Sequence, residues 1–552
     1  MPSRHHASLL RLVPTGTKGL TGPHALCLLI ALTLAGAWAG WKARQWTFEH
    51  TDTLRWRFDI RNNLHYGLRA VDEGWLNVYG NVAAETPSGQ YGLDYPPLRL
   101  LVVRQWAAWV RGTYGSDEWR KEFALHRPLL AFNAATEAAS AVAVFLLIRM
   151  WVRRSSVELP REQSPWLGVP RGMLGAALVW FSPASHLSAH GWPCGDCWVP
   201  PFFLFAVLLA CGRRWFWSGL LLGVGTMLKG QQLMVMPLFV LWALFMWQPT
   251  HALRWLIGYG LAVALVASPW LLRDEATRAP SVPVIALLFA VVSSAVLVLA
   301  AMWRRGLRCR AAVERWGLAT AVAVTTTLAA AGGWLGTDLT WLRVGFMYGA
   351  GKFPSLHMGT SYNLSTLLAA TFRWRQLNDV LFTLPLGTGW PVTIRGLLSG
   401  LSIIALALSA LGMAIHSLRP NRSFLAATAA PWVALFAFGP QMHCRYLLFG
   451  STAAALLAGL GIGPALLAVL LTVATWMMIV HMMHDAWNGR LDGLPRGFGS
   501  YIPETHAGPL ESFLRGAFPG WTYLVLMCTL ILLYLALRPL QTSSPYAKAG
   551  PE

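Results

Sequence analysis

Charge is scarce in this sequence of 552 residues, and acidic charge is the scarcest. Charged residues make up 12% of the chain, with 24 Asp plus Glu, whereas hydrophobic residues make up 55%. A soluble protein has roughly a quarter of its residues charged, which is about twice the share found here. The shortage excludes a string of soluble domains, and the mean hydropathy of +0.46 indicates a membrane protein.

Cysteine is also sparse, and the 7 cysteines are scattered, so no disulfide framework is expected. Cys194 and Cys197 form one C-x-x-C pair, but a zinc site of that kind needs a second pair, which the chain lacks. No spacing of His, Asp and Glu indicates a metal site, so neither a metal nor another cofactor is expected. A local disulfide and two unpaired thiols are the two interpretations of the pair.

Basic residues outnumber acidic ones by 44 to 24, which gives a formal net charge of +20. In a soluble protein this excess would indicate nucleic-acid binding. Here the arginines fall in turns between apolar stretches, and a cytoplasmic N-terminus places those turns on the cytoplasmic side, as the positive-inside rule requires. The partner expected is therefore the lipid bilayer and not a nucleic acid. The turns contain Arg153 and Arg154, Arg213 and Arg214, the Arg304–Arg310 cluster, Arg419 and Arg422, and Arg538.

Apolar segments of membrane-spanning length recur along the whole chain. About 14 spans are predicted, with a range of about 11 to 14 because the short segments between 171 and 248 can merge or re-enter. The fold expected is an all-α polytopic membrane protein. The first span is interpreted as an uncleaved anchor, because no clear cleavage site follows it; a signal peptide is the alternative. The segments lie near 25–43, 127–151, 171–187, 198–212, 215–232, 233–248, 252–271, 283–303, 315–335, 395–417, 422–440, 446–462, 463–484 and 521–538.

The predicted organisation has a basic cytoplasmic N-terminus over 1–24 and a transmembrane module over 25–484. Two long polar loops of that module, 44–126 and 336–394, face the non-cytoplasmic side. They combine Trp, Tyr, Gly and Pro with charge, which is typical of loops that pack on a membrane surface. A further loop and the last span follow over 485–540, and a disordered cytoplasmic tail over 541–552.

Acidic residues lie mostly in the non-cytoplasmic loops and not in the predicted spans, where Glu137 is the clearest exception. A transporter or flippase of lipid-linked saccharides is expected to have paired ionisable residues at mid-bilayer, together with internal repeats. Neither is evident in the sequence. The distribution favours chemistry at the membrane–water interface, and the transporter is kept as the alternative.

The segment Gly92–Leu98 reads GLDYPPL. Its two prolines fix their own φ angles and restrict the residues before them, so they form a rigid extended turn. Such a turn can hold the Asp94 carboxylate against the bilayer surface. The alternative is a structural turn in which Asp94 caps a helix.

This segment resembles the G-L-D-Y-P-P-L signature of the lipid-phosphate-sugar-dependent glucosyltransferases of asparagine-linked glycosylation. Those enzymes are members of the GT-C superfamily of integral-membrane glycosyltransferases. Three more stretches resemble elements of the family or its bacterial relatives, in the same order, and the resemblance covers about residues 45–460. The stretches are Pro183–Trp198 (PASHLSAHGWPCGDCW), Leu228–Leu233 (LKGQQL) followed by Pro237, and Pro440–Leu447 (PQMHCRYL).

One position departs from the family pattern, because Cys444 stands where the family usually has Glu. If that Glu orients the neighbouring basic side chains, this chain must organise its phosphate site differently. A catalytically silent GT-C homologue that binds lipid-linked sugar is therefore a second alternative.

The resemblance implies a GT-C fold and an inverting transfer of a hexose from a polyprenyl-phosphate-sugar donor. The acceptor is a hydroxyl group of a lipid-linked or cell-envelope glycan. Such a reaction needs a carboxylate to take the acceptor proton and cations to balance the departing phosphate. It also needs a groove between spans for the polyprenyl tail.

Asp59 is the expected catalytic base, because it lies early in the first non-cytoplasmic loop, where the superfamily's catalytic Asp usually falls. Its segment is expected to form a short helix lying on the membrane surface. Asp94 and Asp72 are the other candidates for the base, and Asp94 is otherwise expected to shape the site or bind acceptor. A surface salt bridge with Arg57 or Arg61 is the structural alternative for Asp59.

His443, Arg445 and Lys229 are expected to bind the donor phosphate, for which the arginine fork is well suited. The alternative is an interfacial histidine with snorkelling basic side chains that only anchor helix ends. Residues expected to border the donor or acceptor sugar are His190, Asp196, Lys352 and His357. Arginine greatly outnumbers lysine and no eukaryotic retention signal is evident, so a bacterial inner membrane with a periplasmic active site is expected.

Overall fold

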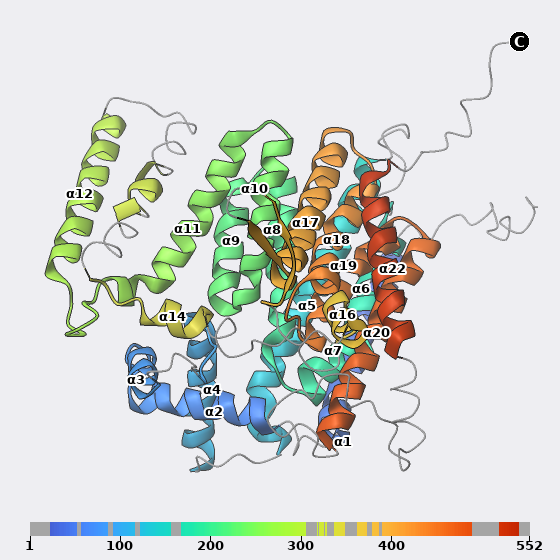
Figure 1. Ribbon diagram of the computed structural model, residues 1–552, viewed down its shortest axis with the longest axis horizontal. Coiled ribbons are helices and arrows are strands. Elements are labelled where there is room, and N and C mark those ends of the chain that lie inside the picture. The colour runs from blue at the N-terminus through green and yellow to red at the C-terminus, as the bar shows by residue number, and fades with distance from the viewer. Residues whose placement is uncertain are drawn as a thin grey trace, which may run out of the picture.

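The computed structural model is about 81% helical, and its helices form a bundle, with α2 and α3 lying below the upright helices in Figure 1. The residues that the structure describes are 23–51, 57–86, 92–115, 122–155, 167–304, 317, 319–324, 326–327, 336–347, 361–372, 378–385, 389–487 and 518–539.

The α-helices of the first half of the chain are α1 (Pro23–His50), α2 (Arg57–Asp72), α3 (Val78–Glu85), α4 (Pro97–Tyr114), α5 (Phe123–Arg154), α6 (Val169–Trp180), α7 (Pro183–His186), α8 (Val199–Cys211), α9 (Trp215–Leu228), α10 (Met236–Phe245) and α11 (Pro249–Leu271). Those of the second half are α12 (Val282–Arg304), α14 (Thr340–Phe346), α16 (Leu364–Phe372), α17 (Ile394–Leu418), α18 (Ser423–Phe438), α19 (Leu447–Ala454), α20 (Ile462–Trp487) and α22 (Phe518–Leu537). Short π- or 3₁₀-helical turns are η1 (Leu187–Gly191), η2 (Gly195–Trp198), η3 (Gly230–Val235), η4 (Cys444–Tyr446) and η5 (Ala455–Gly459).

Among the residues that the structure describes, five helices are long and apolar enough to cross a membrane: α5, α11, α17, α20 and α22. A sixth span results if Val169–Gly191 and Gly195–Cys211, which meet at a bend of 117°, are counted together. The same bend is compatible with the re-entrant alternative. Helices of this length and composition indicate an integral membrane protein. Other apolar helices, among them α9 and α18, have only 10–17 residues, so the count of about 14 spans stays a prediction.

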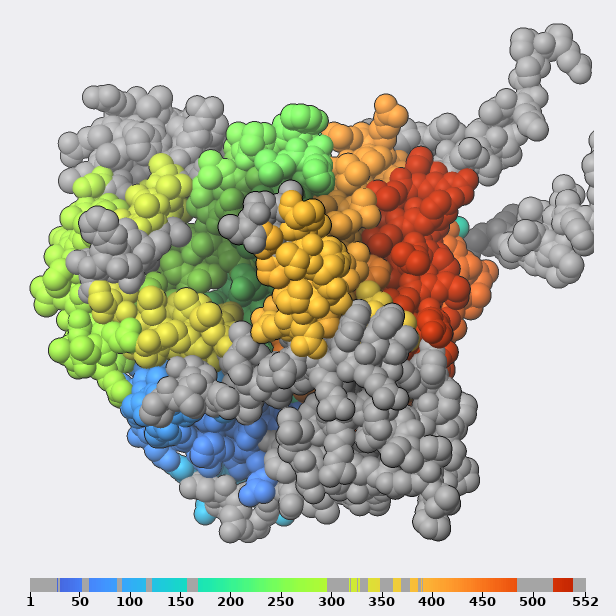
Figure 2. Space-filling model, in the orientation of Figure 1, coloured from blue at the N-terminus to red at the C-terminus, as the bar shows by residue number. Residues whose placement is uncertain are grey.

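The apolar segments predicted from the sequence correspond to helices wherever the structure describes them in full, and 315–335 is described only in part. One small element differs from the all-α expectation. Strands β1 (Val380–Leu384) and β2 (Trp390–Thr393) pair antiparallel, with Val380 opposite Thr393. In Figure 2 this segment, in gold, lies on the surface of the bundle between green helices and the red α22.

The first polar loop is largely helical and contains α2, α3 and α4. Pro97 begins α4, where the missing proline N–H leaves no hydrogen bond unmade. Gly115 ends the helix with a φ of 60°, a left-handed conformation that glycine adopts without strain. The short helix predicted around Asp59 is present as α2, with Asp59 in its first turn.

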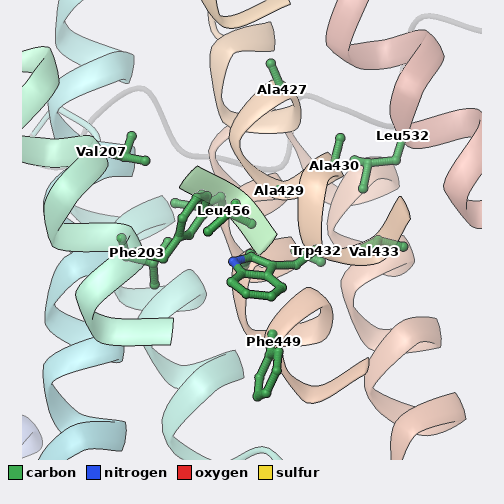
Figure 3. Packing of buried hydrophobic residues seen from close by; sticks show 14 of the residues in the cluster. Phe203, Val207, Ala427, Ala429, Ala430, Trp432, Val433, Phe449, Leu456 and Leu532 are labelled. Atoms are coloured by element: carbon green, nitrogen blue, oxygen red, sulfur yellow. The ribbon is translucent and has the colours of Figure 1, made fainter. Parts of the chain in front are cut away.

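The largest hydrophobic cluster lies among α5, α8, α10 and α17–α22, and aromatic rings fill its centre (Figure 3). The Trp432 ring packs edge-on against Phe203 and Phe449, with centroid distances of 5.9 and 5.1 Å. Trp151 stacks on Phe424 at 4.0 Å. Large rings held in this way immobilise the helices that hold the polar segments at the bundle end.

Two glycines let α9 and α11 approach each other until their backbones touch. A Cβ atom on Gly219 would lie 2.0 Å from the Trp255 carbonyl oxygen, and one on Gly258 would lie 2.0 Å from the Phe216 carbonyl oxygen. Because neither backbone oxygen can move away cheaply, only glycine fits at these positions. Small residues at helix contacts are a common way to pack membrane helices closely.

We expect Gly258→Ala to destabilise the fold by about 1–3 kcal/mol, because the added methyl group overpacks the contact between α9 and α11. The measurement is thermal unfolding of the purified protein in detergent. The matched control is Gly112→Ala in α4, where an added Cβ meets nothing within 4 Å. That change should be neutral or stabilising by about 0.5–1 kcal/mol. Equal melting temperatures for the two variants would contradict the close packing.

Candidate functional site

Asp59 lies in the first turn of α2, where the positive end of the helix dipole stabilises a carboxylate. Its Oδ2 atom is 2.9 Å from Nη1 of Arg445, which lies in η4, 386 residues further along the chain. The Trp192 indole N–H donates to the same oxygen at 2.5 Å, and the Arg445 guanidinium lies 4.1 Å from the centroid of the Trp192 ring. Three distant segments thus meet at one carboxylate.

Asp196, in η2, is the second carboxylate of the site and is fully buried. Its Oδ1 is 2.9 Å from Nζ of Lys229, and its Oδ2 is 3.3 Å from Nε of Arg445. The Cys194 thiol donates to Oδ2 at 3.0 Å. Asp59, Arg445, Asp196 and Lys229 therefore form a chain of alternating sign, named here the four-charge cluster.

The four members differ in how far they are open to solvent. The Asp59 side chain is 38% exposed, whereas those of Arg445, Asp196 and Lys229 are 14%, 1% and 7% exposed. A buried ion pair is stable only when each charge keeps its partner. Asp196 is therefore the carboxylate that holds the two cations, and Asp59 is the one that a substrate can reach.

The charge states of the exposed part of the site follow from these contacts. Burial raises the pKa of Asp59, but the Arg445 guanidinium and the Trp192 hydrogen bond outweigh it and hold that pKa below its ordinary value. Burial, reinforced by the charge of Arg445, lowers the pKa of His443 to about 3. At neutral pH Asp59 is therefore ionised, and His443 is a neutral imidazole.

His443 and Cys444 organise the turn that carries Arg445. The His443 Nδ1 atom accepts a hydrogen bond from the Arg445 backbone N–H at 3.3 Å, which caps η4. The Cys444 sulfur is buried, 3.3 Å from the same nitrogen. Since Asp59 and Asp196 hold the guanidinium, the orientation of Arg445 in this chain does not depend on a carboxylate at position 444.

The GLDYPPL turn lies beside the cluster and is tightly packed. The Tyr79 hydroxyl donates to the Tyr95 carbonyl at 2.6 Å, and the buried Arg99 guanidinium lies 3.8 Å from the centroid of the Tyr95 ring. Asp94 is 45% exposed, with Oδ1 3.9 Å from Nη1 of Arg99. Helix α4 begins without a side-chain cap, so Asp94 faces Arg99 instead of capping the helix.

Asp72 is placed far from the cluster. It is the last residue of α2, about 20 Å from Asp59 along the helix axis. It is more than half exposed, and its Oδ1 is 2.5 Å from Nη1 of Arg111. Among the described residues, Asp59 forms its ion pair with Arg445 and not with Arg61. The pair of Asp72 with Arg111 is therefore a surface salt bridge at the far end of the same helix.

His190 lies in a second buried network, next to the cluster in sequence. Its Nε2 atom is 2.8 Å from Oε2 of Glu137, near the middle of α5, and the Ser185 hydroxyl donates to the other oxygen of that carboxylate. Nε of Arg44, in α1, is also 2.8 Å from the Glu137 carboxylate. Because η1 carries His190 and leads directly to Trp192, this network fixes the segment that carries one wall of the site.

Lys352 and His357, the remaining candidates, lie outside the described residues. Within the part of the chain that the structure describes, no group of three or more His, Cys, Asp or Glu side chains is placed to hold a metal ion.

Comparison with known proteins adds no relative: no protein-family model and no curated protein matches the sequence.

Three contributors to the site were not expected from the sequence: Trp192, Cys194 and Arg99. The first two lie inside the motif between His190 and Asp196, and their polar atoms point at the two carboxylates. Arg99 is an arginine in the apolar stretch just after the two prolines, and arginine is rarely buried without a partner. An arginine in an apolar stretch was therefore the sequence signal that Arg99 has a buried partner.

Asp196→Asn should destabilise the protein strongly, because it leaves Lys229 buried without a full counter-charge. Removing one partner of a buried pair costs about 3–5 kcal/mol. Asp72→Asn is the matched control, since it breaks an ion pair that is exposed to solvent and contributes little to stability. Both are measured by thermal unfolding in the same detergent. A loss for Asp196→Asn no larger than that of the control would show that the cluster does not support the fold.

Proposed function

We propose that this protein is an inverting glycosyltransferase of the GT-C type. It transfers a hexose from a polyprenyl-phosphate-sugar donor to a hydroxyl group of a lipid-linked or cell-envelope glycan. The observation that carries the proposal is the four-charge cluster, in which a reachable carboxylate touches a buried cation at one end of an apolar helical bundle. The sequence motifs that resemble the family supply three of its four members.

The reaction has the following balance. The acceptor oxygen attacks the anomeric carbon from the face opposite the phosphate, and Asp59 takes the hydroxyl proton as the new C–O bond forms. The bond between the anomeric carbon and the phosphate oxygen breaks, and its electron pair stays on that oxygen. The phosphate changes from a diester with one negative charge to a monoester with about two. Arg445 and Lys229 stabilise this added charge.

The contact between Asp59 and Arg445 explains how a carboxylate of low pKa serves as a base. In the free enzyme the arginine holds the carboxylate in its ionised form and lowers its basicity. A donor phosphate competes for the same guanidinium, because arginine binds phosphate and carboxylate with the same fork. Once Arg445 turns to the phosphate, the pKa of Asp59 rises and the carboxylate accepts the proton more readily.

The other residues of the site have supporting roles in this proposal. His443 is neutral in the free enzyme, so it contributes a hydrogen bond to the donor phosphate and gains charge only when the phosphate is bound. Asp94 and Arg99 border the acceptor side through the GLDYPPL turn. His190 positions the segment of Trp192 and does not contact the sugar. Lys352 and His357 stay candidates for the acceptor entrance.

The transporter is the second candidate, and one observation favours it: Glu137, Arg44 and His190 are buried together, with Glu137 near the middle of a spanning helix. Every one of these charges is satisfied by protein partners, and their side chains are at most 2% exposed. A transport site must instead open to a solute. We therefore assign the network a positioning role.

The cellular setting in this proposal is a bacterial inner membrane with the four-charge cluster on the periplasmic face. The GT-C architecture with about 14 spans belongs to the same proposal. The charges at the two ends of α9 support this orientation in the membrane. The cluster adjoins the end of α9 at Lys229, whereas Arg213 and Arg214 precede the start of that helix. The positive-inside rule assigns the arginine-rich end to the cytoplasm.

Asp59→Asn should abolish hexose transfer, with a loss of about 10²- to 10⁴-fold in kcat, because the acceptor hydroxyl loses its proton acceptor. Purified protein is incubated with a panel of radiolabelled polyprenyl-phosphate hexoses and a membrane glycan extract, and labelled product is counted. Asp72→Asn, at the other end of the same helix, is the control and should retain activity.

Three outcomes would contradict the proposal. Equal transfer by wild type and Asp59→Asn would remove Asp59 as the base. Absence of transfer with every donor, together with measurable flipping of a fluorescent lipid-linked saccharide, would establish the transporter. Tight donor binding by wild type without transfer or flipping would establish the catalytically silent homologue.

The pH dependence of kcat/KM should show where Asp59 titrates in the free enzyme. Because its pKa is lowered from the ordinary 3.8, the active carboxylate persists at and above pH 4 and is lost only as the pH falls through the lowered value. Arg445→Gln removes the opposing cation, so the pKa of Asp59 should rise and the acidic limb should move to higher pH. The measurement is the pH profile of each variant. An acidic limb at the same pH in both would show that Arg445 does not control Asp59.

A further inference from the structure

A cavity of about 440 Å³ lies at the opposite end of the bundle from the four-charge cluster. Its walls come from the ends of α5, α8, α10 and α17 and from the starts of α9 and α11. Helix α9 connects the two regions, with Trp215 at its start in the cavity wall and Lys229 just after its last residue. The helix is 14 residues long, so the two regions lie about 20 Å apart.

The polar lining of the cavity is cationic. Arg154 and Arg213 lie at its rim, and His251 and Gln248 lie further in. None of the described residues that line it is acidic. In a chain with so few charges, two arginines facing one cavity without a carboxylate leave an uncompensated positive potential there.

Two polar groups of the lining lack a partner within the described part of the chain. The Nδ1 atom of His251 is buried without a hydrogen bond. No described residue accepts a hydrogen bond from the Arg213 guanidinium, which lies at the cavity rim. The φ of 60° at Arg213 belongs to the turn that ends α8, where the Arg213 N–H donates to the Ala210 carbonyl at 2.8 Å and the Arg214 N–H donates to the Leu209 carbonyl at 2.9 Å. The His251 nitrogen and the Arg213 guanidinium therefore remain available to a ligand.

The remaining lining residues hold the polar groups in place. The His251 ring stacks on Trp215 with a centroid distance of 5.3 Å and an interplanar angle of 11°. Arg154 donates from Nη2 to the Cys211 carbonyl at 3.2 Å and lies 5.5 Å from the centroid of the Trp151 ring. The cavity is therefore built before a ligand arrives.

Exposed tryptophans place the cavity mouth at the depth of lipid headgroups. Trp247, in the turn between α10 and α11, is 91% exposed, and Trp217, in the first turn of α9, is 57% exposed. Tryptophan is enriched at the membrane–water interface, where one side of its ring is apolar and the other is wet. A headgroup at this depth can reach the cavity without leaving the membrane.

We propose that this cavity binds a phosphate group, presented by the headgroup of an anionic phospholipid. The arginine forks match phosphate oxygens, and the unpaired His251 nitrogen supplies a further polar contact. The volume is in the range of small-ligand pockets and accommodates a phosphate with its polar substituent. The site is independent of hexose transfer, because it lies at the other end of the bundle.

The test uses the full-length protein purified in detergent and native mass spectrometry with added lipid. Phosphatidylglycerol is the anionic probe, and phosphatidylcholine with the same acyl chains is the zwitterionic control. The test variant is the double substitution Arg154→Gln with Arg213→Gln. Arg127→Gln is the matched control, because Arg127 is an exposed arginine near the opposite end of the same helix α5.

Wild type and Arg127→Gln should retain one phosphatidylglycerol under conditions that remove phosphatidylcholine. The double variant should bind phosphatidylglycerol at least about tenfold more weakly, since charged hydrogen bonds are lost. Release of the lipid by inorganic phosphate would support a site that takes phosphate from either source, and retention would support the lipid alone. Equal retention by the double variant, or equal retention of both lipids by wild type, would overturn the proposal. Unchanged melting temperatures verify that the variants are folded.

Discussion

The double pairing of Arg445 is the interaction on which the candidate site depends. Its guanidinium contacts Asp59 on one side and Asp196 on the other, within a bundle that buries most of the cluster. Away from water, each charge is tolerable only next to its opposite. The positions of α2, η2 and η4 relative to one another are therefore constrained by electrostatics, whereas the rest of the bundle is constrained by packing.

The scarcity of charge makes each charged group in the bundle informative. Among the described residues, those that line the cavity include arginines and no carboxylate, those at the cluster end alternate in sign, and those around Glu137 form a closed network. The Glu137 network and the four-charge cluster meet in the segment from His190 to Asp196. Apolar helices offer few polar contacts. The segment from His190 to Asp196 is held in place by both networks, and it therefore presents the Trp192 indole N–H and the Asp196 carboxylate at defined positions.

The sequence predicted the helical membrane fold well, because apolar runs and arginine-rich turns reflect strong local preferences. It also brought Asp59, Asp196, Lys229 and Arg445 into one hypothesis, although only through motif resemblance. It did not predict that Asp196 would hold both cations, that His190 would pair with Glu137, or that Trp192 would donate to Asp59. Such pairings depend on how distant helices pack, and no local pattern encodes them. The span count stays open for a related reason, since short apolar helices such as α9 and α18 are assigned by packing and not by composition.

The distance along the chain between Asp59 and Arg445 has a consequence for biogenesis. Arg445 lies 386 residues after Asp59, so this length of chain must be synthesised and inserted before the cation reaches its carboxylate. Asp196 and Lys229 are close enough in sequence to pair early during synthesis. Asp59 can pair with Arg445 only after η4 has been made. A chain truncated before η4 therefore has no complete cluster, and Asp59 acquires its counter-charge only late in assembly.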